Sequence, residues 1–144
     1  MEITFTPSAV GAQEAFLNIV SNDAYPPGDN IFIPLSGWGV DASVDPGELM
    51  ATVIAFFDES VSGGSIAGSG PGNSAAGRLK AFGNMLKASS DLIEAGAYDL
   101  ACTQLQDALN RTDGGTPPPD FVTGDSADEL AAMIMEVMDA LGCL

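Results

Sequence analysis

Histidine is absent from this sequence and basic residues are scarce. None of the 144 residues is His, which removes the most common general base and the most common metal ligand. Lys and Arg total 4 against 20 Asp and Glu, so the net charge is −16 at neutral pH. Because nucleic acids and anionic membranes attract clustered cations, this balance argues against either as a partner.

Long apolar runs are also missing. No stretch approaches the roughly 18–20 apolar residues of a membrane span, so we expect no membrane insertion. Met1 is followed by Glu2, Ile3 and Thr4, without the basic stretch and apolar core of a signal peptide. The chain is therefore either cytoplasmic or a piece of a longer exported protein. Its 46% hydrophobic content is too high for a disordered acidic tail.

Residues 2–40 carry the pattern of β-strands. Apolar residues alternate with polar ones over residues 2–6, and again over 12–21, which is the period of a half-buried strand. A third strand is predicted over 31–40. Pro34 lies inside it and indicates an edge or a bulge, because proline cannot donate a hydrogen bond to a neighbouring strand.

From Asp45 onward the apolar residues recur at the spacing of amphipathic helices. Asp45 followed by Pro46 is typical of a helix start. A second helix is predicted from a cap at Asn73 or Ser74 to Gly96, a third over 98–111, and a fourth after a capping box at Ser126–Glu129. The Gly/Ser-rich residues 64–72 are expected to form a flexible loop between the first two helices. Four helices with mostly short links predict an antiparallel bundle.

The predicted fold class is therefore α+β, with a short antiparallel β segment followed by an antiparallel bundle of about four helices. The predicted division is a partial β module over residues 1–41 and a helical module over 42–144. A β segment this short cannot bury its own core. It must pack on the helices, pair with another chain or expose a sheet edge. Because open edges recruit partners, a homodimer through residues 2–40 is expected.

Four separate parts of the β segment together form a recognisable sequence pattern. They are Ile3-Thr-Phe-Thr-Pro7, Gly11, residues 15–23 (AFLNIVSND) and residues 33–39 (IPLSGWG). With these anchors, about 40 residues resemble the last strands of an Ig-like module of the choice-of-anchor D type, related to the ASH family. The resemblance implies a repeated, non-catalytic spacer of secreted and surface proteins. The earlier strands of that family are missing here.

The helical part contains a second set of characteristic segments: 56–61 (FFDESV), 70–74 (GPGNS), 92–96 (LIEAG), 101–105 (ACTQL), 118–122 (PPDFV) and 141–143 (LGC). With these it resembles, more loosely, the FIMAH-like helical modules near the C-termini of secreted bacterial and archaeal proteins. The resemblance implies an accessory role without catalytic residues. We therefore expect a non-catalytic spacer at the C-terminus of a secreted or cell-surface prokaryotic protein, with the upstream domains of that protein as its partners.

Cys102 and Cys143 are the two cysteines. One lies on the third predicted helix and the other follows the fourth, so antiparallel packing could bring them together. Two free buried thiols are the alternative. The resemblance to exported modules favours a disulfide, because disulfides persist in oxidising compartments. Two cysteines without His make a poor zinc site.

Other candidate sites use acids and aromatics. Asp41, Asp45 and Glu48 cluster at the predicted domain junction and could hold Ca²⁺, although Asp45 and Glu48 are also explained as helix-capping groups. Trp38 and Phe121 could present a carbohydrate or partner protein with an aromatic surface, although a lone aromatic beside a domain junction is more often packing. A binding module, possibly assisted by calcium, is thus the alternative to the spacer. A hydrolase using acids alone ranks last.

Overall fold

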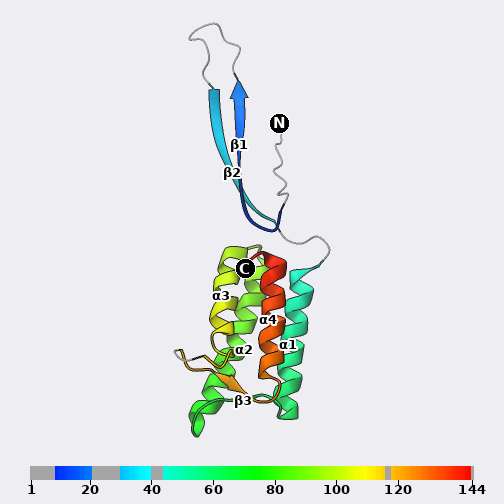
Figure 1. Ribbon diagram of the computed structural model, residues 1–144, viewed down its shortest axis with the longest axis vertical. Coiled ribbons are helices and arrows are strands. Elements are labelled where there is room, and N and C mark those ends of the chain that lie inside the picture. Colours follow the sequence, from blue (N-terminus) through cyan, green and yellow to red (C-terminus); the bar gives the residue numbers. More distant parts are fainter. Residues whose placement is uncertain (1–8, 21–29, 40–43, 116–117, 144) are drawn as a thin grey trace.

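The computed structural model describes residues 9–20, 30–39, 44–115 and 118–143. A β-hairpin projects from one end of a four-helix bundle, along the long axis of the molecule (Figure 1). A second, much shorter pair of strands lies at the opposite end of the bundle. The predicted α+β fold class, with antiparallel strands and four helices, is confirmed.

The hairpin consists of β1 (Gly11–Val20) and β2 (Asn30–Gly39). The strands pair antiparallel without interruption, from Gly11 opposite Gly39 to Val20 opposite Asn30. Pro34 lies within this continuous ladder, opposite Phe16, so β2 is an edge strand and carries no bulge. The strand predicted over residues 2–6 lies outside the described residues.

Helix α1 (Pro46–Gly63) begins at the predicted start after Asp45 and ends before the Gly/Ser-rich residues 64–72. The Asp45 carboxylate accepts a hydrogen bond of 2.8 Å from the Gly47 backbone N–H, which caps the first turn. Gly64 ends the helix in the left-handed conformation, with φ of 79°. Gly64 can adopt this conformation without strain because it has no Cβ.

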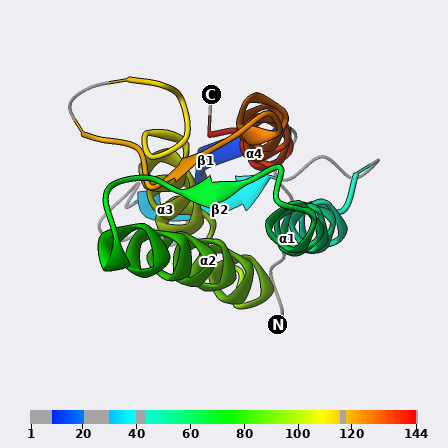
Figure 2. The same cartoon turned by 90° about the horizontal axis from the view of Figure 1, so that it is seen from below.

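Three further helices complete an up-down-up-down bundle: α2 (Asn73–Glu94), α3 (Tyr98–Leu109) and α4 (Ala127–Leu141). Helix α1 packs against α2 and α4, and α3 packs against the same two (Figure 2). No described helix has the length and apolar character that crossing a membrane requires. The buried core contains Met50, Val53, Phe57, Phe82, Leu86, Ile93, Leu105, Leu130, Ile134, Val137, Met138 and Leu141, joined by Ile66 and Val122 from the connecting segments.

Two predicted side-chain caps are wrong. Helix α2 has Gly72 as its N-cap with no side-chain cap, and the Ser74 hydroxyl instead donates to the Pro71 carbonyl at 2.6 Å. Ser126 precedes α4, but its side chain makes no capping bond, so the predicted capping box does not form. Helix α3 ends at Leu109, two residues before the predicted end.

The expected flexible loop between α1 and α2 is also a misprediction. It contains β3 (Ala67–Gly68), which pairs antiparallel with β4 (Val122–Thr123) on the segment before α4. Ile66 is only 1% exposed and belongs to the core. A Cβ on Gly68 would lie 1.8 Å from the Ala75 carbonyl oxygen, so only glycine allows this close approach. The β3–β4 pair therefore closes the end of the bundle far from the hairpin.

Candidate functional site

Trp38 attaches the hairpin to the end of α4. Its ring N–H donates a hydrogen bond of 2.5 Å to the carbonyl oxygen of Leu141, the last residue of that helix. The final carbonyls of a helix lack partners within the helix, so Trp38 satisfies a group that would otherwise need water or a cap. This bond joins Trp38 and Leu141, which lie 103 positions apart in the sequence.

The next residue, Gly142, contacts the base of the hairpin through its backbone. It caps α4 in the left-handed conformation with φ of 72°. A Cβ on Gly142 would lie 2.5 Å from the Gly11 nitrogen and 2.7 Å from a methyl carbon of Val10. The hairpin can rest on the end of α4 only because both Gly11 and Gly142 lack side chains at this contact.

The third residue in this run, Cys143, forms a disulfide with Cys102 of α3. The resemblance to exported modules favours this pairing over two free thiols, and the structure contains it. Leu141, Gly142 and Cys143 are consecutive, and each joins α4 to a different element. We call these three residues the joint. Through the joint, the hairpin is tied to α4, and α4 is tied covalently to α3.

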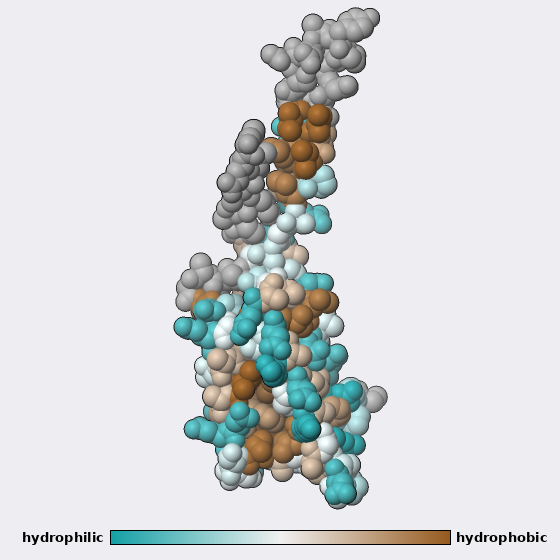
Figure 3. All heavy atoms as spheres, turned by 180° about the vertical axis from the view of Figure 1, so that it is seen from behind, coloured by the Kyte–Doolittle hydropathy of each residue, from teal (hydrophilic) through white to brown (hydrophobic). Residues whose placement is uncertain are grey.

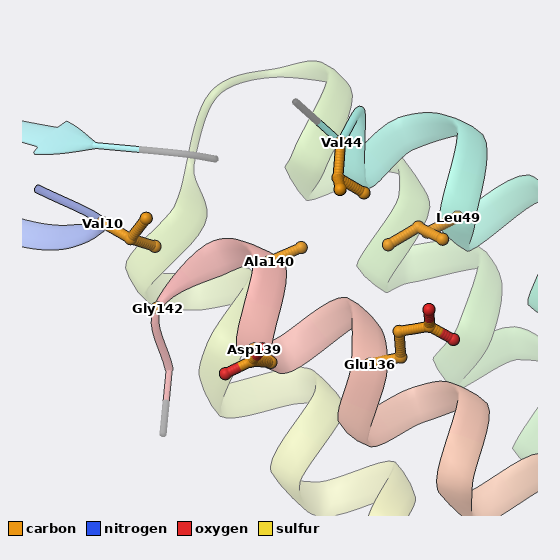
Figure 4. A pocket seen from close by; sticks show the side chains of 7 residues that line it. All are labelled: Val10, Val44, Leu49, Glu136, Asp139, Ala140 and Gly142. Atoms are coloured by element: carbon orange, nitrogen blue, oxygen red, sulfur yellow. The ribbon is translucent and has the colours of Figure 1, made fainter. Parts of the chain in front are cut away.

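A cavity of about 380 Å³ opens beside the joint (Figure 4). Glu136 and Asp139 line it from α4, and the aliphatic Leu49 lines it from α1. The cavity is therefore apolar in part and negative in potential. Its remaining lining residues are Val10, Val44, Ala140 and Gly142.

The hairpin exposes apolar side chains on both of its sides. Side chains alternate along a strand, and residues opposite one another in the register share a side. On one side, Phe16 is 70% exposed and Phe32 is 62% exposed. On the opposite side, which we call the aliphatic side and whose residues are given below, Ile31 is 55% exposed. Apolar residues are concentrated on the hairpin in Figure 3. The aliphatic side consists of Ala15, Leu17, Ile19, Ile31, Ile33 and Leu35.

The two predicted aromatic ligand residues lie at opposite ends of the bundle. Trp38 is half-buried at the joint, as described above. Phe121 is half-buried beside β4, and the Arg111 guanidinium carbon lies 4.6 Å from the centre of its ring. The Phe121 N–H also donates to the Arg111 carbonyl at 2.8 Å. Each ring has an internal contact, which favours packing over an open sugar-binding surface.

The three predicted calcium ligands are not brought together by anything the structure describes. Asp41 lies outside the described residues. Asp45 caps α1 through its carboxylate, and Glu48 is exposed in the first turn of that helix. Within the described ranges, no three His, Cys, Asp or Glu side chains are close enough to hold a metal ion. Calcium binding stays a prediction.

Sequence reasoning did not find the contact between Gly11 and Gly142 or the acceptor role of Leu141. Both involve backbone groups, which leave no pattern of side-chain types. Comparison with known proteins adds no assignment: no family model, no curated protein and no solved structure matches this chain.

Proposed function

We propose that this chain is a non-catalytic accessory module of a secreted or cell-surface protein, which spaces or docks an upstream domain. The bundle acts as the base and the hairpin as a projecting arm. The observation that supports this most directly is the joint. It attaches the arm through a side-chain hydrogen bond, a backbone contact and the adjacent disulfide, where a simple linker would let a neighbouring domain swing.

The dimensions of the arm suit a spacer. Each strand of the hairpin has 10 residues, and an antiparallel strand rises about 3.4 Å per residue, so the arm spans roughly 34 Å. Apolar side chains on both of its sides offer a neighbouring domain a surface to dock on. Residue chemistry supports the extracellular setting, because disulfides persist there and salt screens the self-repulsion of an acidic chain.

The attachment of the arm can be tested with Trp38, which is the only Trp in the sequence. In dilute oxidised protein, we expect acrylamide to quench Trp38 fluorescence much less than it quenches free tryptophan amide. Reducing the disulfide should increase quenching, because Cys143 no longer holds the joint. Trp38 quenched as strongly as the free amide in the oxidised protein would contradict an attached arm.

The export part of the proposal has a separate test. Protein taken from its native source is alkylated without reduction, and its intact mass is measured. Two unalkylated cysteines that become reactive only after reduction are expected for a secreted or surface protein. Alkylation of both Cys102 and Cys143 before reduction would contradict the extracellular assignment.

A further inference from the structure

The register of the hairpin determines which backbone groups point outward. In an antiparallel pair, hydrogen-bonded and non-hydrogen-bonded residue pairs alternate. Pro34 has no N–H, yet the ladder continues through it, so Pro34 and Phe16 form a non-hydrogen-bonded pair. The even-numbered residues of both strands therefore point their N–H and C=O groups away from the partner strand. The Ala12 carbonyl agrees with this, since it accepts from the Gln13 side chain at 3.0 Å.

The two outer edges of the hairpin differ as docking sites for a strand. Along β1, the outward N–H groups of Ala12, Glu14, Phe16 and Asn18 form an uninterrupted row. Along β2, the row is broken in its middle at Pro34, and proline is a common means of blocking a sheet edge. In the described part of the chain, no strand pairs with the outer edge of β1.

We propose that a second copy of this chain pairs with the outer edge of β1, so that two hairpins form one four-stranded antiparallel sheet. An isolated two-stranded hairpin is marginally stable, and three or more strands with an apolar side are needed for independent stability. Pairing β1 with β1 meets this need through one symmetric contact, as expected for a twofold dimer. The inference is independent of the proposed spacer function.

The sequence of β1 selects one register for this pairing. Residues whose backbone N–H and C=O groups point outward must pair with residues of the same kind in the second copy. Even-numbered positions therefore pair with even-numbered positions. A twofold axis at Phe16 pairs every even-numbered residue of β1, from Ala12 to Val20, and places Phe16 opposite the Phe16 of the second copy. It also places Glu14 opposite Asn18, a carboxylate opposite an amide. An axis at Ala15 would leave Val20 without a partner. An axis at Glu14 would instead oppose two carboxylates, which destabilises a cross-strand pair.

The charge of the chain sets the conditions for association. Each copy has a net charge of −16, so two copies repel one another at low salt. The screening length falls from about 10 Å at 0.1 M salt to about 3 Å at 1 M, so the dimer should strengthen as salt rises. A contact along one strand edge is small, and we expect affinity at the weak end of the range for protein interfaces.

A matched pair of variants tests the choice of edge. Glu14 and Ser36 lie opposite one another in the hairpin, and both N–H groups point outward, but on opposite edges. Glu14→Pro removes a donor from the β1 edge, and Ser36→Pro removes one from the β2 edge. Neither variant removes a hydrogen bond between β1 and β2. Glu14→Pro also removes a negative charge, which by itself would favour association.

Sedimentation velocity over a series of protein concentrations in 0.5 M NaCl measures the dimer. Wild-type protein should dimerise, and Ser36→Pro should stay within about twofold of its dissociation constant. Glu14→Pro should weaken the dimer by about tenfold or more, because symmetry removes two donors from each dimer. Wild-type protein that stays monomeric throughout would overturn the proposal. Equal weakening by both variants would also overturn it, because association would then use another surface.

Amide hydrogen exchange measured by NMR gives a second readout that does not depend on a variant. The amides of Glu14, Phe16 and Asn18 should exchange fast in dilute protein and gain protection as concentration rises. The amides of Ala15 and Leu17, which bond to β2, should be protected at every concentration. Protection of the even-numbered amides in the dilute monomer would overturn the proposal, because another part of the same chain would then cover the edge.

Discussion

Substituting Gly142 by Ala should measure how strongly the hairpin is held on the bundle. Gly64 provides a matched control, because both glycines end a helix in the left-handed conformation, with φ of 72° at Gly142 and 79° at Gly64. Alanine in that conformation costs about 1 kcal/mol relative to glycine. This contribution is common to both variants.

The surroundings of the two glycines differ. No atom lies within 4 Å of a Cβ built on Gly64, whereas one built on Gly142 would lie 2.5 Å from the Gly11 nitrogen. The base of the hairpin must therefore move in Gly142→Ala. Moving it disrupts the hydrogen bond between Trp38 and Leu141, which contributes about 0.5–1.5 kcal/mol. We expect Gly142→Ala to lower the free energy of unfolding by about 1.5–2.5 kcal/mol, against about 1 kcal/mol for Gly64→Ala.

Urea denaturation followed by far-ultraviolet circular dichroism measures the two free energies of unfolding. Trp38 fluorescence reports separately on the joint. Before any urea is added, emission should shift to longer wavelength in Gly142→Ala and stay unchanged in Gly64→Ala. Equal destabilisation of the two variants, together with unchanged Trp38 emission in both, would refute the contact between the hairpin and α4.

Two further predictions concern the bundle. Replacing Cys102 and Cys143 together by Ser should lower the free energy of unfolding by about 4 kcal/mol in a urea titration, because the bridge spans 41 residues. A loss below about 1 kcal/mol would contradict a closed disulfide in the folded protein. Gly77→Ala should raise the unfolding free energy by about 1 kcal/mol, since its Cβ would enter open space within α2. Gly83→Ala should raise the unfolding free energy by less in the same urea titration, because its Cβ would lie 3.3 Å from the Phe57 ring. A larger increase at Gly83 than at Gly77 would contradict the packing of α1 on α2.

The helices could be predicted because their signals are local. Apolar residues such as Met50, Val53 and Phe57 recur at helical spacing, and the structure buries all three. The Asp45 cap is equally local, since its acceptor and donor are two residues apart. The side-chain cap expected at Ser126 shows the limit of such signals. The residue types of a capping box are present there, but the side chain makes no capping bond.

The parts that sequence could not predict depend on distant backbone contacts. Strand β3 has two residues, too few to show any period, and it pairs with residues more than 50 positions away. The joint brings Gly11 against Gly142 through main-chain atoms alone. A lone apolar Ile66 in a Gly/Ser-rich stretch was the one available signal that this segment enters the core. The Cys102–Cys143 pairing rested on the family resemblance and the expected compartment.

The bundle is closed differently at its two ends, and this affects how it bears mechanical force. At the hairpin end, the disulfide joins α3 to α4 covalently. At the far end, the β3–β4 pair and the hydrogen bonds beside it join the described segments between the helices without a covalent link (Figure 1). Tension applied to the hairpin passes along the polypeptide into α1 and, through the non-covalent contact at the joint, into α4, which the disulfide holds to α3. Separation of α3 from α4 under load must therefore begin at the β3–β4 end, because the disulfide prevents it at the hairpin end.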